Sequence, residues 1–302
     1  MSPAGVATQA ARAATTSLER SPFEPRALKN LLLTVGVWLA ALLAAVPLVS
    51  VLYMLVVRGG ARLSTSLFVE LPPAGFEMGG GFGNAIVGTL VMVGLGGLIS
   101  IPVGVLAAVF LAELGPESRL SQVTRFATKT LTGMPSILTG VFAYAVVVLT
   151  TGTYSAPAGG VALAVLMLPT VVLTAESAIR VVPKITRDAA YGMGCTRSQV
   201  IWKVLLPTAM PGILTGVMLA VARAAGETAP LLFTALFSSF WLFEGGTPKL
   251  MQPTASLAVL IYNFAGMPFE NQIELAWAAS LVLVMIVLFV NIVSRLIGRR
   301  RV

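Results

Sequence analysis

The 302-residue sequence has no histidine, a single cysteine and few charged residues. Without histidine, the chain cannot use an imidazole as a metal ligand, a general base or a pH switch. The single cysteine, Cys195, excludes an internal disulfide and a cysteine-rich metal site. Charged residues make up 11% of the chain, whereas a soluble domain carries about 25%. Because apolar residues make up 57%, the composition predicts a membrane protein.

Long uncharged runs predict the spans. A helix needs about 20 apolar residues to cross the hydrocarbon core of a bilayer. Runs of at least that length separate the charged clusters, and a turn-rich stretch at 151–160 divides the longest run in two. The sequence therefore predicts an all-α integral membrane protein with six transmembrane helices. These are expected within 30–57, 84–112, the two halves of the uncharged stretch between Lys129 and Glu176, 212–236 and 275–297.

The basic residues predict the orientation. Sixteen of the 20 Lys and Arg residues fall on the side that holds both termini, three fall on the other side, and Arg223 lies within a span. Cytoplasmic loops collect Lys and Arg, so both termini and the loop between the fourth and fifth spans are expected in the cytoplasm. Because the net charge of +8 sits at span ends, it favours a membrane protein over a nucleic-acid-binding one.

These features divide the chain into four predicted segments. Residues 1–29 form a cytoplasmic tail, and 30–83 hold the first helix and an irregular external loop. The first apolar run is about twice as long as the core of a signal peptide, so we expect a retained helix. Residues 84–297 form a five-helix core with a cytoplasmic loop at about 181–211, and 298–302 form a basic tail. The pattern leaves open whether the external stretch at 237–274 holds a re-entrant or interfacial helix.

The most specific pattern lies in the cytoplasmic loop. Asp188-Ala189-Ala190 is followed by Gly194 and, after nine further residues, by Val204-x-Leu206-Pro207. This resembles the E-A-A-x3-G-x9-I-x-L-P loop of ABC-importer permeases, with Asp188 in place of Glu and Val204 in place of Ile. The resemblance implies a short helix that docks on an ATPase subunit.

The physical character of this loop allows two interpretations. The small Ala189, Ala190 and Gly194 would permit close approach to a partner, and Arg187 and Arg197 could reach acidic or carbonyl groups beside it. A basic amphipathic segment can instead lie on anionic membrane lipid. The ordered spacing favours the docking interpretation.

A second set of motifs shows which kind of ABC-importer permease the sequence resembles. Residues 222–232 read Ala-Arg-Ala-Ala-Gly-Glu-Thr-Ala-Pro-Leu-Leu, and 133–137 read Gly-Met-Pro-Ser-Ile. Together with Asn84 and Gly88-Thr89-Leu90, they resemble the PstA-type permease subunits of bacterial phosphate ABC importers, from about residue 84 to about 235. The resemblance implies a type I ABC importer permease fold in the bacterial inner membrane and a non-catalytic role in importing inorganic phosphate.

The same resemblance implies partners. These are a homologous PstC-like permease, a PstB-like ATPase dimer that carries ATP and Mg, and an extracytoplasmic PstS-like phosphate-binding protein. The chain has no Gly-x4-Gly-Lys-[Ser/Thr] loop, so it is expected to bind no nucleotide cofactor and to borrow its ATPase.

Charged residues within the spans are the candidate site. An isolated Arg at the bilayer centre costs at least about 2.5 kcal/mol on insertion scales. Arg223 is therefore expected on an anion pathway together with Glu227 and Thr228, or in an internal ion pair with Glu227 one helical turn away. Glu176 and Arg180 have the favourable order of an i,i+4 pair, which favours a structural pair over a gate.

Two other functions remain open at this point. The chain could be an ABC permease for another oxyanion, such as sulfate or molybdate. It could also be a secondary, ion-coupled transporter, although the sequence has no detectable inverted repeat.

Overall fold

The computed structural model describes residues 25–244 and 247–299. Most of the predicted tail at 1–29 and the end of the predicted tail at 298–302 lie outside these residues. The chain divides into two units, Met1–Met54 and Leu55–Val302. The described part of the first unit is one long apolar helix, α2 (Pro25–Met54), which contains Pro47.

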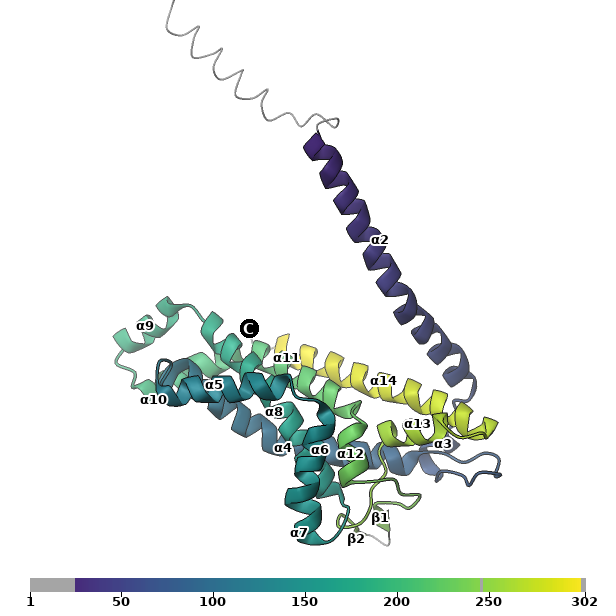
Figure 1. Ribbon diagram of the computed structural model, residues 1–302. Helices are drawn as coiled ribbons and strands as arrows, with labels where there is room; N and C mark the ends of the chain where they lie inside the picture. Colours follow the sequence, from purple (N-terminus) through teal and green to yellow (C-terminus); the bar gives the residue numbers. More distant parts are fainter. Residues whose placement is uncertain (1–24, 245–246, 300–302) are drawn as a thin grey trace, which may run out of the picture. The chain divides into compact units, whose positions relative to one another are not determined.

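The second unit is helical with one short hairpin (Figure 1). Its longest helices are α4 (Gly83–Val109), α8 (Ala156–Val181), α11 (Leu206–Ala225) and α14 (Glu270–Arg299). The shorter ones are α3 (Ser66–Val69), α5 (Arg119–Thr132), α6 (Ser136–Ala143), α7 (Leu149–Thr151), α9 (Lys184–Gly192), α10 (Arg197–Gln199), α12 (Ala229–Thr234) and α13 (Leu257–Ala265). Wider π-helical turns lie at η1 (Leu55–Gly59), η2 (Phe110–Leu114), η3 (Tyr144–Val148) and η4 (Val200–Leu205). Strands β1 (Phe243–Glu244) and β2 (Thr247–Pro248) pair antiparallel, with Phe243 opposite Pro248.

The long helices pack side by side. Helix α4 packs along α8, α8 along α11, and α11 against α14 (Figure 1). Met92 of α4, Leu163 and Met167 of α8, and Val217 of α11 are buried in their common core. Small residues allow the close approach of α8 and α11: a Cβ at Gly212 would lie 2.7 Å from the Cβ of Ala178.

The predicted all-α membrane architecture is confirmed, and the number of spans depends on one bent pair. Five stretches are long and apolar enough to cross a membrane, namely Leu28–Gly59, Gly83–Leu114, Ala156–Val181, Arg197–Ala225 and Glu270–Ser294. The sixth candidate joins α5 to the segment Ser136–Thr151, with a bend of 107° between them. The third span is therefore not the straight helix that its uncharged run suggests. Pro135 precedes α6 in an extended conformation, and the residue before a proline avoids the helical region, so the helix breaks there.

The fifth span also differs from the prediction. We expected a helix over 212–236, but the helix that includes η4 and α11 begins at Arg197 and ends at Ala225. A second, short helix, α12, follows after Gly226, Glu227 and Thr228. Pro230 lies in the first turn of α12, where its missing amide proton costs no helical hydrogen bond, so it suits the start of a new helix. Arg223 consequently lies in the last turn of α11 and not near the middle of a span.

The undecided stretch at 237–274 contains the hairpin and the apolar helix α13. The hydroxyl of Ser256 caps α13 by accepting a hydrogen bond of 3.2 Å from the amide of Val259. Helix α4 holds this segment in place. The side-chain amide of Asn84 donates hydrogen bonds to the backbone carbonyl oxygens of Ser238 and Phe240. The hydroxyl of Thr89 accepts a 2.8 Å hydrogen bond from the backbone amide of Leu257.

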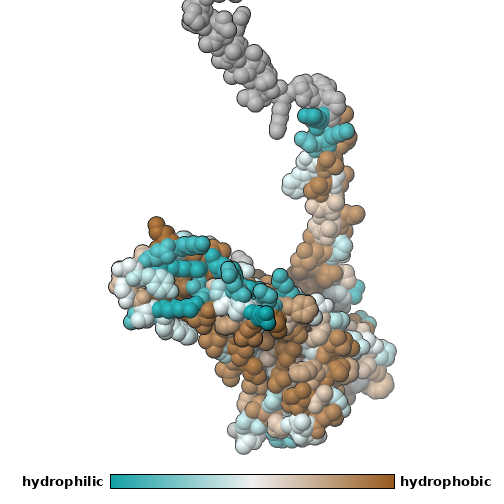
Figure 2. Space-filling model, turned by 60° about the vertical axis from the view of Figure 1, so that its left-hand side comes forward, coloured by the Kyte–Doolittle hydropathy of each residue, from teal (hydrophilic) through white to brown (hydrophobic). Residues whose placement is uncertain are grey.

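Hydrophilic residues gather at one end of the second unit. Figure 2 shows them over the end that carries α9 and α10, while the visible sides of the helices are mostly hydrophobic. This distribution suits a bundle that crosses a bilayer and places one polar end in water.

Candidate functional site

The break between α11 and α12 brings Arg223 and Glu227 together. The Nε atom of Arg223 lies 3.4 Å from Oε1 of Glu227, and the two side chains are 42% and 18% exposed. Within the described residues, the Arg223 side chain makes no other hydrogen bond or ion pair, so its terminal Nη atoms keep free donors. A partly exposed guanidinium with free N–H donors at a helix break can bind an anion.

Thr228 connects the break to α13. Its hydroxyl lies 3.5 Å from the carbonyl oxygen of Ala258, at the outer limit of a hydrogen bond. The backbone carbonyl oxygen of Thr228 accepts hydrogen bonds from the backbone amides of Leu231 and Leu232, and these bonds begin α12.

The second halves of the two broken helices pack against each other. A Cβ at Gly140 of α6 would lie 2.7 Å from Cα of Pro230 in α12, so only a glycine fits at this contact. The breaks at Pro135 and at Gly226 are thereby linked through the helices that follow them.

An apolar groove of about 580 Å³ opens beside the α11 break. Ala222 and Gly226 line one side, and α14 lines the other from Leu283 to Ile292. Asn291 is the polar residue in this lining, and its amide donates to the carbonyl oxygen of Val287 in its own helix.

The predicted docking loop folds into α9 followed by a sharp turn. Gly194 has a φ angle of +84°, which side-chain-bearing residues rarely adopt. The amide of Cys195 donates to the carbonyl oxygen of Ala190 at 3.1 Å, and the amide of Gly194 donates to that of Tyr191 at 2.9 Å. These two bonds are the Schellman pattern that terminates a helix, so Gly194 shapes the turn.

The next helix begins at once. The side chain of Thr196 accepts from the amide of Gln199, and the side chain of Gln199 accepts from the amide of Thr196 at 2.9 Å. This capping box starts α10, which continues through η4 into α11. The loop therefore consists of helix α9, a turn closed by the two backbone hydrogen bonds, and the capped N-terminus of α10.

The loop residues predicted to contact a partner fall into two groups. Asp188 and Ala189 are exposed on α9, together with Ile185. Ala190 is only 2% exposed and packs into the core of this chain. The face of α9 that carries Ala190 is covered by the bundle, so a partner would meet the face that carries Asp188 and Ala189.

Arg187 also has internal partners. Its Nη1 atom lies 2.8 Å from Oε1 of Glu113, and its Nη2 atom donates to the carbonyl oxygen of Ile179 at 2.9 Å. Arg197 donates to the backbone carbonyl of Glu113. The guanidiniums that we expected to reach a partner are bonded to the ends of η2 and α8.

Glu176 and Arg180 form the expected i,i+4 ion pair, with 3.0 Å between Nε and Oε1. The same oxygen accepts a 2.9 Å hydrogen bond from Nε of Arg125 on α5. Arg125 also donates to the carbonyl oxygens of Leu111 and Pro116. The Glu176 carboxylate thus joins α5 to α8, and both arginines reach the carbonyl oxygen of Leu111.

Sequence reasoning missed Glu113 and Arg125. Each forms its ion pair with a residue on another helix, and no short-range spacing encodes that. The one available signal was that both are charged residues between the second and third predicted spans.

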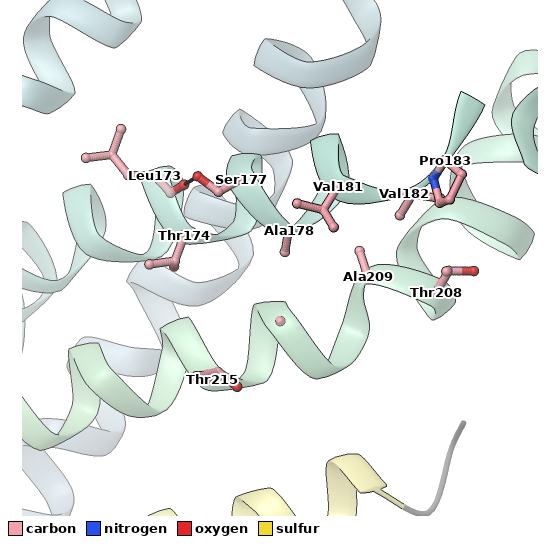
Figure 3. A pocket seen from close by; sticks show the side chains of 11 residues that line it. Leu173, Thr174, Ser177, Ala178, Val181, Val182, Pro183, Thr208, Ala209 and Thr215 are labelled. Atoms are coloured by element: carbon pink, nitrogen blue, oxygen red, sulfur yellow. Dashed lines mark hydrogen bonds between the residues drawn. The ribbon is translucent and has the colours of Figure 1, made fainter. Parts of the chain in front are cut away.

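Leu206 is buried and Pro207 is exposed at the start of α11. The wide turn of η4 directly precedes Pro207, which suits a helix that must continue past a residue without an amide proton. Close by, a groove of about 700 Å³ lies between the end of α8 and the start of α11 (Figure 3). Its hydroxyl groups donate to carbonyl oxygens of their own helices, as with Ser177 and Leu173, so the lining offers little polar chemistry.

Comparison with known proteins identifies the family. The model of the binding-protein-dependent transport system inner membrane component matches residues 100–302. The phosphate transport system permease protein PstA of Pasteurella multocida is 40% identical over 279 residues, which cover 92% of this chain and 98% of that protein. The protein of the same name in Haemophilus influenzae is 44% identical over 246 residues, 82% of this chain and 85% of the relative.

Solved structures support the fold. An inward-facing structure of the MetNI methionine ABC transporter matches 72% of this chain and 93% of its own, with 22% identity and a TM-score of 0.55. A crystal structure of an amino acid ABC transporter with histidines matches with 17% identity and a TM-score of 0.52. The chain has the permease fold of ABC importers and is a transport component of the inner membrane. It belongs to the binding-protein-dependent transport system inner membrane components and, within them, to the family of PstA phosphate transport system permeases.

Proposed function

We propose that this chain forms half of the translocation pathway of an ATP-driven importer of inorganic phosphate. The names and close similarity of its relatives support the substrate class. The observation that carries the proposal is the Arg223 guanidinium at the α11 break. It is held by one 3.4 Å ion pair and keeps its remaining donors free.

The chemistry of these groups suits phosphate. The planar guanidinium can hold a tetrahedral oxyanion with two parallel hydrogen bonds. Phosphate near neutral pH carries a proton that the carboxylate of Glu227 can accept in a hydrogen bond, whereas sulfate carries none. Glu227 would therefore restrain Arg223 in the empty pathway and favour phosphate over a fully ionised oxyanion. Sulfate or molybdate remains the second candidate substrate.

The proposal includes partners and an orientation. A PstC-like permease would supply the other half of the pathway, and a PstS-like binding protein would deliver phosphate from outside. A PstB-like ATPase dimer would hold ATP and Mg and contact the exposed face of α9, where Asp188 and Ala189 lie. Both termini would be cytoplasmic, because that is where the basic residues gather. This chain itself would hold no cofactor.

Reconstituted uptake tests the proposal. Vesicles containing the chain with its candidate permease and ATPase partners are supplied with ATP, radiolabelled phosphate and the binding protein. We expect uptake that requires ATP and persists in excess sulfate. Uptake of sulfate in preference to phosphate would show that sulfate is the substrate. Uptake without the ATPase would overturn the proposal of an ATP-driven importer.

A further inference from the structure

Glu113 stands at the end of the helix formed by α4 and η2, next to α9. Its carboxylate and the guanidinium of Arg187 are 13% and 20% exposed and lie 2.8 Å apart. The two residues are 74 positions apart in the sequence numbering, so the pair joins separate elements. The backbone carbonyl of the same Glu113 accepts a hydrogen bond from Arg197 of α10.

Few other contacts hold α9. Its main packing partner is η4, and Ala190 is its buried residue. The chain connects α9 directly to α8 through Val182 and Pro183, and to α10 through Gly194. Helix α4 has no such covalent connection to α9. Glu113 therefore provides a direct side-chain link between α9 and the α4 span.

Arg187 joins a third element at this point. Its Nη2 atom donates to the carbonyl oxygen of Ile179 in the last turn of α8. One guanidinium thus ties α9 to the ends of two spans. A displacement of α9 that keeps these bonds must move the ends of η2 and α8 together.

We propose that Glu113 is a positioning residue that couples α9 to the α4 span through Arg187. This inference rests on the proposed function, in which an ATPase acts on α9. Glu113 contacts neither the Arg223 site nor the exposed face of α9. Its role is to transmit movement of α9 to the helix that packs along α8 and anchors the 237–265 segment.

The decisive variant is Glu113→Gln, which keeps the shape of the side chain and removes its charge. We expect the complex to assemble and to hydrolyse ATP at its basal rate. Phosphate imported per ATP should fall by at least about tenfold, which corresponds to about 1.4 kcal/mol of lost coupling. Glu113→Asp should recover part of the import because it keeps the charge. The matched control is Glu117→Gln, which makes the same change at an exposed position four residues along, and it should behave as the wild type.

A second measurement does not involve phosphate. Cys195 follows α9 directly, is half-buried, and is the single cysteine of the chain. Its rate of reaction with a membrane-permeant maleimide reports opening of the joint between α9 and the bundle. We expect Glu113→Gln and Arg187→Gln each to raise this rate. The double variant should raise it no further than Arg187→Gln alone, because Arg187→Gln already removes the Glu113 ion pair as well as the bond to Ile179.

These results separate the inference from the function on which it rests. If the wild type fails to import phosphate, the proposed function fails, while Cys195 labelling still tests the joint. Unchanged import per ATP in Glu113→Gln would overturn the coupling role. So would additive labelling effects in the double variant, or a loss of import that only follows a loss of assembly.

Discussion

Arg223→Gln is the most informative single substitution in the pathway. Its cost to folding should be small. The ion pair with Glu227 spans 3.4 Å between partly exposed side chains, in the less favourable Arg-before-Glu order. Pairs of this kind contribute about 0.3–0.5 kcal/mol. The variant should therefore insert into the membrane in nearly normal amounts.

Its cost to transport should be much larger. A hydrogen bond to a charged group contributes about 1.5–3 kcal/mol, and an anion in the pathway loses at least one when the guanidinium is removed. That loss corresponds to a fall in phosphate uptake of roughly 10- to 150-fold. Arg223→Lys should be intermediate, because it keeps the charge and loses the planar fork.

The assay is the initial rate of ATP-dependent phosphate uptake, divided by the amount of the chain in the membrane. Arg119→Gln, at an exposed position on α5, is the matched control and should transport normally. Two results together would refute a role of Arg223 in binding the anion: normal uptake by the Arg223→Gln variant, and a Glu227→Gln variant that no longer accumulates in the membrane. The pair would then be a structural ion pair, and the substrate would pass elsewhere.

Ala189→Arg should insert normally but co-purify with less ATPase, whereas Ala190→Arg should reduce the amount of protein in the membrane, because residue 190 is 2% exposed. The reverse result would show that the inner and outer faces of α9 are misassigned. In a cysteine-free background, Phe76→Cys should react with an impermeant thiol reagent on intact cells, since residue 76 is 93% exposed, while Gln122→Cys should react only after permeabilisation. The opposite labelling would invert the proposed orientation. Glu176→Gln leaves two arginines without their carboxylate, and removing one partner of a buried pair costs about 3–5 kcal/mol. A lower melting temperature in detergent is therefore expected, and an unchanged one would mean that this carboxylate does not hold α5 to α8.

Local spacing allowed the family and several contacts to be predicted. The letters of the docking loop lie at fixed spacings between Asp188 and Pro207, and those of the 222–232 motif are contiguous, so one sequence is enough to recognise them. The partners in the pairs of Glu176 with Arg180 and of Arg223 with Glu227 lie four positions apart, and both pairs are formed. Their functional roles stay predictions.

The helix breaks were harder to predict, although their signals were present. Pro135 and Pro230 are both present in the sequence, but we expected each span to be one helix. Instead, α5 and α6 are separate helices on either side of Pro135, and α11 ends at Ala225, before the new helix in which Pro230 lies. Composition alone does not distinguish a kink from a break.

Contacts between distant helices could not be predicted from this sequence. Arg125 donates a hydrogen bond to Glu176 across 51 positions, and Glu113 forms an ion pair with Arg187 across a longer separation. Both carboxylates lie at span ends with several arginines within reach, so charge counting gives no unique pairing. The burial of Ala190 and the exposure of Ala189 likewise depend on how α9 rests on η4.

The positive φ of Gly194 bears on how such loops can be exchanged between permeases. Gly194 and the Thr196 cap determine where α9 stops and where the next helix starts, whereas Asp188 and Ala189 present the outward surface. A chimaera meant to recruit a different ATPase should therefore transplant the outward residues of α9 and retain the recipient's own glycine and cap. Swapping the whole motif as a block would alter the register of the following span together with the recognition surface.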